Sequence, residues 1–460
     1  MGMRTTIAVI GGGLGGYPAA IKAARMGAEV TLIEKDLLGG TCLNWGCIPT
    51  KSLLQSGEVI KTIKEAELFG IHCGDYEFDF TAIMNRKNHV VRQLRGGVQK
   101  LLAAKKIRVI KGTATLVDPS TVEILETREK IKSDKIIIAT GSSPAKLNIE
   151  GGEGAGILDS NGFLEMKRLP STAVIIGGGV IGVEFAQILN RMGVNVTILE
   201  LMENLIPGID AEIALALEKS IVEDGITVFT KANISKIKQQ KGGNTTCFTF
   251  QEKPEEIKAE KIILSVGREP ELKLLNAKKI GLAHKNGTLV VNDRMETNIP
   301  GIYAAGDVVG GMMLAHVAIA EGECAVQNAM GRKTTMSYRA IPLCIYTSPE
   351  VASVGLREEE AKERHDIQVG RFPFYACGRA LVLNQTYGMV KIISEKKYGE
   401  VLGVHIIGPH ATDMIAEAVL GMTMEMTAED LAHAVHPHPT LSEGVMEAAL
   451  MICGGAIHMP

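Results

Sequence analysis

One pattern occurs twice in this chain: a short apolar run, a glycine-rich turn, a helical stretch and a second run that ends in an acid. The first copy covers residues 7–34, with Gly11, Gly13 and Gly16 in the turn and Glu34 at the end. Glycines in this spacing allow a tight turn and let the backbone approach a pyrophosphate at the helix N-terminus. The final carboxylate stands where it can accept hydrogen bonds from ribose hydroxyls. The pattern predicts a dinucleotide-binding unit.

The second copy covers residues 173–200, with Gly177, Gly179 and Gly182 in the turn and Glu200 at the end. Such a repeat predicts two dinucleotides in one chain. Glu200 favours NAD over NADP, because a carboxylate accepts a hydrogen bond from a 2′-hydroxyl but repels a 2′-phosphate, and the next two residues supply no arginine. The alternative, a duplicated fold without functional sites, is disfavoured because both acids are present.

Two cysteines, Cys42 and Cys47, follow the first unit in the stretch GGTCLNWGCIPTK, residues 39–51. A local bend can bring their sulfurs within disulfide distance. Because Pro49 is tolerated in a first helical turn, we expect the pair to straddle a helix start, where the helix dipole and the Lys51 ammonium lower a thiol pKa. A zinc half-site would need a second pair of ligands, and none follows nearby. We therefore predict a redox-active dithiol beside a cofactor and no metal site.

Composition limits the classes of partner. With 460 residues the chain is long enough for about three domains, and its net charge of −3 gives no electrostatic case for nucleic acid or membrane binding. No apolar run approaches the length of a membrane span, and the first strand begins too close to Met1 for a signal peptide. The other six cysteines are scattered, as is typical of reduced buried thiols. We expect a cytoplasmic protein.

Three further segments set small or charged residues after apolar runs. Thr140 and Gly141 follow the run IIIA, where small residues let the chain cross close to a cofactor, and Gly267 and Arg268 follow the run KIILSV. Asp307 follows the run GIYAAG and presents a carboxylate that can bind a ribityl or sugar hydroxyl, although an aspartate in a turn is otherwise common. We expect these five residues to contribute to cofactor binding.

A histidine motif near the C-terminus carries a candidate base. His438 lies five residues before Glu443, so a loop or helix start can hold the carboxylate against the imidazole, orienting its tautomer and raising its basicity. A dithiol must lose a proton before it attacks a disulfide, and such a base removes that proton. His436 competes for the role on sequence grounds alone.

These motifs together resemble the flavoprotein pyridine nucleotide-disulfide oxidoreductases, and among them the enzymes that oxidise dihydrolipoamide, over essentially the whole chain. CLNWGCIPTK (42–51) is similar to the family's active-site disulfide motif and AAGD (304–307) to its second FAD motif. YTSPEVASVG (346–355) and HPHPTLSE (436–443) resemble signatures of its dimerisation domain.

The resemblance implies an α/β fold with two Rossmann-like dinucleotide-binding domains and a C-terminal α+β dimerisation domain. FAD is then held by the first unit together with the Asp307 segment, and NAD by the second. The implied partners are a second copy of the chain and a lipoyl domain of a 2-oxo acid dehydrogenase complex or a lipoylated glycine-cleavage carrier. The implied boundaries are 1–145 and 266–337 for the two parts of the FAD-binding domain, 146–265 for the NAD-binding domain and 338–460 for the dimerisation domain.

The resemblance also implies individual roles. Cys42 is the thiol that exchanges with the substrate, and Cys47 is the thiol beside the flavin. His438, rather than His436, matches the base, which in the family reaches the disulfide of the other subunit. Lys51 lies near the flavin and pairs with Glu184, which lies next to the nicotinamide site.

The chain departs from the family pattern at a few positions. Trp45 lies between the cysteines, Pro18 enters the first helix, and Glu271 follows GREP where asparagine is frequent. A mercuric reductase would need a C-terminal vicinal cysteine pair, whereas the tail has only Cys453, and a glutathione or trypanothione reductase would need an arginine near Glu200. Another flavin-dependent reductase of a small disulfide and a redox sensor without turnover are the remaining alternatives.

Overall fold

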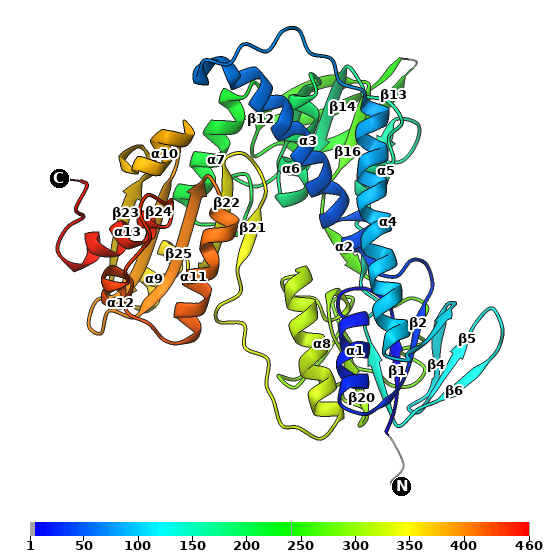
Figure 1. The fold of residues 1–460 in the computed structure, drawn as a ribbon. Helices are drawn as coiled ribbons and strands as arrows, with labels where there is room; N and C mark the ends of the chain where they lie inside the picture. Colours follow the sequence, from blue (N-terminus) through cyan, green and yellow to red (C-terminus); the bar gives the residue numbers. More distant parts are fainter. Residues whose placement is uncertain (1–4, 241, 460) are drawn as a thin grey trace.

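Both copies of the repeated pattern form parallel sheets, and a third, antiparallel sheet follows them (Figure 1). The computed structural model describes residues 5–240 and 242–459. Within these residues, three five-stranded sheets carry most of the helices. We name the parts built on them the first unit, the second unit and the C-terminal unit. No helix in the described ranges combines the length and apolar composition that crossing a membrane requires.

The first unit is assembled from two separate stretches of chain. The order of its strands is β20 (Ile302–Ala304), β7 (Lys135–Ile138), β1 (Thr6–Ile10), β2 (Glu29–Glu34) and β3 (Arg108–Lys111). Strands β20, β7 and β1 are buried on both faces, as in parallel sheets covered by helices, whereas the edge strand β3 is largely exposed. The helices α1 (Tyr17–Arg25) and α8 (Ala315–Ala329) lie side by side (Figure 1). Pro18 falls in the first turn of α1, where its missing N–H breaks no helical hydrogen bond.

The second unit is continuous in sequence. Its strands follow the order β12 (Thr227–Phe229), β11 (Asn195–Leu199), β10 (Thr172–Ile176), β16 (Lys261–Leu264) and β9 (Ile157–Leu158). Its helices are α5 (Ser160–Leu164), α6 (Val180–Arg191) and α7 (Ala211–Glu223). An antiparallel sheet of β13 (Asn233–Gln240), β14 (Gly243–Phe250) and β15 (Lys253–Ala259) is inserted before β16.

Between β2 and β3 the chain forms helices that bridge the two units. These are α2 (Gly40–Trp45), α3 (Cys47–Glu65), the short η1 (Ala66–Phe69) and α4 (Phe80–Ala104). Helix α3 packs against both α4 and α6, so it connects the first unit to the second.

The smaller elements of these two units are β4 (Ala114–Asp118), β5 (Thr121–Ile124), β6 (Lys130–Lys132), β8 (Ser142–Pro144), β17 (Arg268–Pro270), β18 (His284–Lys285), β19 (Thr288–Leu289) and η2 (Asp307–Val309).

The C-terminal unit is an antiparallel sheet between helices. Its strands follow the order β21 (Leu343–Ile345), β22 (Glu350–Gly355), β25 (Val401–Gly408), β24 (Met389–Glu395) and β23 (Ile367–Pro373). Helix α11 packs on β22 and β25, and α13 packs on β23 and β24. The helical segments are α9 (Glu358–Arg364), η3 (Phe374–Ala376), α10 (Gly378–Leu383), α11 (Ala411–Thr423), α12 (Ala428–His433) and α13 (Glu443–Cys453).

A buried cluster of charges joins the C-terminal unit to the second unit. The ammonium of Lys391 on β24 lies 2.8 Å from a carboxylate oxygen of Asp210, 2.9 Å from Glu212 and 2.7 Å from Glu358. Lys391 is 1% exposed and Asp210 is fully buried. Buried charges are tolerated when they are paired in this way, so the cluster fixes the contact between the two units.

Candidate active site

The two glycine-rich turns have the same backbone geometry. Gly11 and Gly177 have φ angles of +104° and +102°, in the left-handed region that favours glycine. A Cβ atom on Gly16 would lie 1.8 Å from the carbonyl oxygen of Gly11, and one on Gly182 would lie 1.9 Å from that of Gly177. The third glycine of each turn therefore allows the helix start to pack against the strand end.

The middle glycines leave space on the other side of each turn. An added Cβ atom on Gly179 would meet no described atom within 4 Å, and one on Gly13 would meet only the Cα atom of Gly40, at 3.7 Å. Each turn leads into a helix N-terminus, α1 or α6, whose amides attract anions. Both turns can therefore accept a pyrophosphate.

The two strand-end acids make equivalent hydrogen bonds. One carboxylate oxygen of Glu34 accepts from the amide of Gly12 at 2.6 Å, and the other accepts from the amide of Asp36 at 2.7 Å. The corresponding distances for Glu200 are 2.5 Å and 2.7 Å. A carboxylate has about four acceptor positions, so each acid retains acceptors for ribose hydroxyls.

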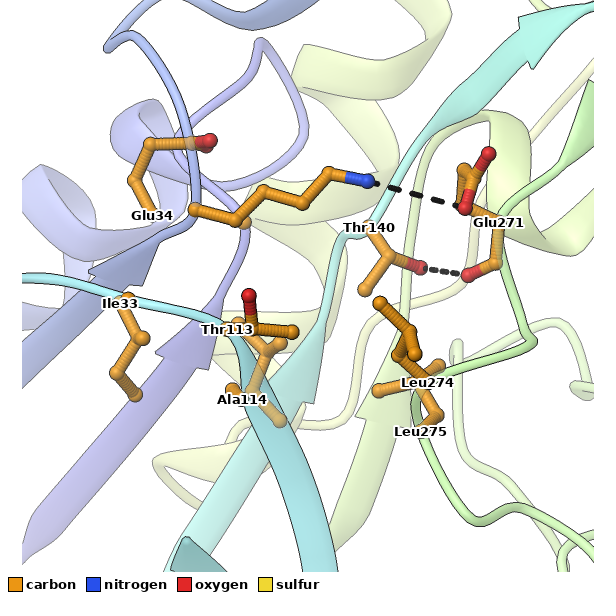
Figure 2. A pocket seen from close by; sticks show the side chains of 12 residues that line it. Ile33, Glu34, Thr113, Ala114, Thr140, Glu271, Leu274 and Leu275 are labelled. Atoms are coloured by element: carbon orange, nitrogen blue, oxygen red, sulfur yellow. Dashed lines mark hydrogen bonds and ion pairs between the residues drawn. The ribbon is translucent and has the colours of Figure 1, made fainter. Parts of the chain in front are cut away.

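A pocket opens beside Glu34 at the ends of the strands of the first unit (Figure 2). Thr140 and Glu271 lie on one side of it and Glu34 on the other. The remaining lining residues are mainly apolar: Ile10, Gly11, Ile33, Lys35, Gly112, Thr113, Ala114, Leu274 and Leu275. An apolar pocket next to a ribose-binding acid suits an adenine ring.

The segments predicted to approach the first cofactor do meet at this end of the sheet. The hydroxyl of Thr140 donates to the carbonyl oxygen of Glu271 at 2.7 Å, and the carbonyl oxygen of Gly141 accepts from the amide of Glu271 at 2.9 Å. Gly141 and Gly267 both have positive φ angles, of +72° and +110°. These bonds tie the end of β7 to the segment after β17.

Arg268 links Asp307 to the helix that carries the first cysteine. Its guanidinium donates to the hydroxyl of Ser142 at 2.7 Å and to the hydroxyl of Thr41 on α2 at 3.3 Å. The hydroxyl of Ser142 donates in turn to the carboxylate of Asp307, which lies 3.9 Å from Arg268. Arg268 and Asp307 are distant in the sequence, but both contact Ser142 and therefore lie together next to α2.

The cysteines lie on either side of a helix break. Cys42 is on α2, and Cys47 is the first residue of α3, which confirms the predicted helix start. A hydrogen bond from the Cys42 thiol, together with the positive charge of Lys51, lowers the pKa of Cys47 to about 7, although burial and Glu184 act in the opposite direction. The same hydrogen bond and burial raise the pKa of Cys42. In the reduced pair, these opposite pKa shifts favour a thiolate at Cys47 and a protonated thiol at Cys42.

Lys51 joins three parts of the molecule. Its ammonium lies 2.8 Å from each carboxylate oxygen of Glu184 on α6 and 4.6 Å from the centre of the Tyr346 ring. The amide of Tyr346 donates to the same carboxylate at 3.0 Å. Glu184 is only 2% exposed, so its charge is held by these partners.

A second side chain on α6 holds the same segment of the C-terminal unit. The side-chain amide of Gln187 donates to the carbonyl oxygen of Ser348 at 3.0 Å and accepts from its backbone amide at 2.8 Å. Gln187 is 1% exposed and lies one helical turn after Glu184. Residues 346–348 are therefore bound to α6 along one face.

The two histidines of the C-terminal motif differ in how much of the ring is free. Both ring nitrogens of His436 are bonded, Nε2 to Glu417 and Nδ1 to the carbonyl oxygen of Ala434, each at 2.8 Å. Nδ1 of His438 lies 2.7 Å from Glu443, whereas its Nε2 has no partner among the described residues, and its side chain is 77% exposed. Only His438 is free to take a proton from a substrate.

Hydrogen bonds keep Glu443 ionised. Burial raises the pKa of this carboxyl, but the bonds from His438 and from the amide of Thr440 outweigh it, and the net pKa is lowered. An ionised carboxylate stabilises the imidazolium that forms when His438 accepts a proton.

His438 lies far from the cysteines of its own chain. Figure 1 shows the segment between α12 and α13 in the left part of the molecule, well apart from α2, which lies near its middle. The structure thus brings together Cys42, Cys47, Lys51 and Glu184, and separately His438 and Glu443.

Comparison with known protein families shows which family has this arrangement of domains. Residues 5–322 match the family described as pyridine nucleotide-disulphide oxidoreductase, and residues 341–449 match the dimerisation domain of the same family. The chain belongs to the pyridine nucleotide-disulphide oxidoreductases. The predicted family and fold class are thereby confirmed, and the dimerisation domain agrees with the predicted homodimer.

Relatives match this oxidoreductase over its whole length. A dihydrolipoyl dehydrogenase from Bacillus subtilis is 42% identical, covering 98% of this chain and 100% of its own. One from Thermus scotoductus is 40% identical and covers 98% of both chains. Among solved structures, LpdA from Mycobacterium tuberculosis has a TM-score of 0.91 at 26% identity, covering 97% of this chain and 99% of its own. The HOCl-induced flavoprotein disulfide reductase RclA from Escherichia coli has a TM-score of 0.86 at 29% identity, covering 96% and 98%.

FAD and NAD are the cofactors of these oxidoreductases, so the predicted pair of cofactors is confirmed at the level of the family. The geometry fits them, since each turn leaves room for a pyrophosphate and each acid retains acceptors for a ribose. The roles of the individual residues stay predictions.

Sequence reasoning missed some residues of the site. Tyr346 was part of a recognised signature without a role, and nothing in the sequence pointed to Gln187. The structure also places the backbone of Lys231 beside the segment after Glu200: the Lys231 amide donates to the carbonyl oxygen of Met202, and its ammonium lies 2.6 Å from Glu203. The ammonium of Lys231 is paired with Glu203, and the preference of Glu200 for NAD over NADP stays a prediction.

Proposed function

We propose that the protein is a dihydrolipoyl dehydrogenase, which oxidises dihydrolipoyl groups to lipoyl groups through the Cys42–Cys47 disulfide, with FAD as flavin and NAD⁺ as acceptor. One observation carries the proposal. A chain that is 42% identical to a dihydrolipoyl dehydrogenase over its full length retains a dithiol with one thiol pKa of about 7 and a His–Glu pair with a free Nε2.

The reaction begins with proton transfer to His438. Its free Nε2 takes a proton from one thiol of the substrate, while Glu443 holds Nδ1–H and stabilises the imidazolium. The substrate thiolate then attacks the sulfur of Cys42 in the oxidised enzyme. The Cys42–Cys47 bond breaks, and Cys47 leaves as the thiolate that its low pKa favours.

The second substrate thiol attacks the substrate sulfur of this mixed disulfide and releases Cys42. Because the pKa of Cys42 is raised, the released sulfur accepts the proton of the second substrate thiol. His438 then gives the first proton to solvent and returns to the neutral form. The substrate leaves as the cyclic disulfide. Bound FAD supplies an acceptor for the electron pair of the reduced cysteines, and NAD⁺ carries that pair away as hydride.

The partners of the reaction are part of the proposal. His438 is exposed and distant from the cysteines of its own chain, which supports a base supplied by the second subunit of a homodimer. We propose a lipoyl domain of a 2-oxo acid dehydrogenase complex, or a lipoylated glycine-cleavage carrier, as substrate, and the cytoplasm as location. The domain limits given above and the cofactor contacts of Gly267 belong to the same proposal.

Replacing His438 by Gln tests the proposal. The variant loses the proton acceptor, so we expect dihydrolipoamide oxidation with NAD⁺ to slow by about a hundredfold or more, with FAD still bound. The measurement is steady-state formation of NADH. His436→Gln is the matched control. It should keep most of the activity, because both ring nitrogens of His436 are already bonded to other residues and neither is free to act as the base. A larger loss in the control than in His438→Gln would contradict the assignment of the base, and unmodified protein without activity on dihydrolipoamide would contradict the proposed function.

A further inference from the structure

An ion pair crosses the pocket beside Glu34 that suits an adenine ring. We name this pocket the adenosine pocket, and the side that the ion pair crosses its mouth. The ammonium of Lys35 lies 3.8 Å from a carboxylate oxygen of Glu271, and the dashed line to the carboxylate of Glu271 in Figure 2 marks this pair. Lys35 follows the last residue of β2, and Glu271 follows the last residue of β17. The pair therefore joins two segments that reach the pocket from opposite sides.

The backbone on the Glu271 side of the mouth is held firmly. The amide of Glu271 donates to the carbonyl oxygen of Gly141 at 2.9 Å, and its carbonyl oxygen accepts from the hydroxyl of Thr140 at 2.7 Å. The Glu271 side chain is 26% exposed and that of Lys35 is 51% exposed. Opening the mouth therefore requires movement of the two side chains and leaves the strand ends in place.

We infer that Lys35 and Glu271 form a clasp over the adenosine end of FAD and slow its release. The inference rests on FAD as the ligand of the first unit. The pocket wall below the pair is apolar, with Ile10, Ile33 and Leu275 buried, so the adenine ring gains its contacts inside and must pass the ion pair to leave. Glu271 also departs from the asparagine pattern of the family, and a neutral side chain cannot form an ion pair with Lys35.

The clasp has a modest and salt-dependent effect. Exposed ion pairs have small energies, so we expect loss of the pair to speed FAD release by about two- to fivefold at low salt. Salt screens such pairs, so the effect shrinks at high ionic strength.

The test measures FAD release from the holoenzyme. The protein is diluted into buffer of about 0.05 M or about 0.5 M NaCl, and the rise of free-flavin fluorescence gives the rate. Glu271→Gln and Lys35→Met should each release FAD about two- to fivefold faster than unmodified protein at low salt. The double variant should be no faster than either single variant, because both changes remove the same interaction.

Two further variants test whether the effect is specific to the ion pair. Glu269→Gln, a charge removal at an exposed position on β17, should release FAD at the unmodified rate. Exchange of the two charges, Lys35→Glu with Glu271→Lys, should restore slow release. Equal rates in Glu271→Gln and unmodified protein, or additive effects in the double variant, would overturn the clasp. Failure of the unmodified apoprotein to bind FAD at all would instead overturn the proposed function on which the clasp rests.

Discussion

At the scale of single residues, the ionisation of Cys47 links the cysteines to their surroundings. Because its pKa is about 7, the thiolate, and with it a long-wavelength thiolate-to-flavin band in the reduced protein, should increase as the pH rises through 7 and disappear below it. Lys51→Met removes a positive charge that lowers this pKa, so the midpoint should move up by about one unit or more. Absorbance of the partly reduced holoenzyme against pH measures the shift.

Matched variants test the assignment of the thiols. Lys51→Arg keeps the charge and should keep a midpoint closer to that of the unmodified protein. Cys47→Ser should abolish the band, whereas Cys42→Ser should retain it. A band that persists in Cys47→Ser would show that the thiol beside the flavin has been wrongly assigned.

A second prediction at this scale concerns Glu200. Its carboxylate has acceptors for a 2′-hydroxyl but repels a 2′-phosphate, and the ammonium of Lys231, whose backbone lies beside the segment after Glu200, is paired with Glu203. NADP should therefore be poorer than NAD by about a hundred- to a thousandfold in kcat/KM. Glu200→Arg should narrow that gap, and Glu203→Gln, which frees Lys231, should narrow it less. Equal efficiency with the two nucleotides in unmodified protein would contradict this interpretation of the second glycine-rich turn.

At the scale of elements, helix α6 connects the nucleotide turn to the C-terminal unit. Gln187→Leu removes both bonds to Ser348 and leaves the partly buried backbone amide and carbonyl of Ser348 unpaired, so we expect a loss of about 1–3 kcal/mol in the free energy of unfolding. Urea unfolding followed by circular dichroism measures it. Asn190→Leu, at a partly exposed position of the same helix, should change that free energy by less than about 0.5 kcal/mol. Similar losses in the two variants would contradict a specific role for Gln187.

At the scale of the whole molecule, the separation of His438 from Cys42 and Cys47 predicts that two inactive subunits can complement each other. A hybrid dimer of Cys47→Ser with His438→Gln combines both defects in one site and leaves the other site intact. If subunits associate at random, about a quarter of all sites should be active. Activity after co-refolding the two variants measures this fraction. Co-refolding Cys47→Ser with Cys42→Ser should restore nothing, and equal results in the two mixtures would contradict a site shared between subunits.

Sequence patterns predicted the parts of the molecule that depend on local spacing. The glycines around Gly11 and Gly177 predicted the two sheets, and the five-residue spacing of His438 and Glu443 predicted their contact. Contacts between units have no such local pattern. Glu184 lies 133 residues from Lys51, and its meeting with that ammonium was expected only from the family resemblance.

The contact between Gln187 and Ser348 spans 161 residues and was not expected at all. A buried glutamine on a helix face is compatible with many partners, and only the packing of α6 against the C-terminal unit selects one. The ion pair between Lys231 and Glu203 was not expected either. It forms because β11 and β12 pair in parallel, so the segments that follow these two strands lie side by side.

The divided construction of the first unit has a consequence for how the protein emerges from the ribosome. The sheet of the second unit is complete once β16 has been made, whereas the sheet of the first unit still lacks β20, and Asp307, which we propose to contact FAD, has not been made. Although domains generally fold in the order of their synthesis, the inserted unit here is able to close before the unit that begins the chain. The four strands of the first unit that have been made then have an unpaired edge at β7, and an unpaired edge is open to association with other chains. We do not expect early binding of FAD to shorten this interval, because Asp307, which we propose as part of the FAD site, is made only after the whole sheet of the second unit.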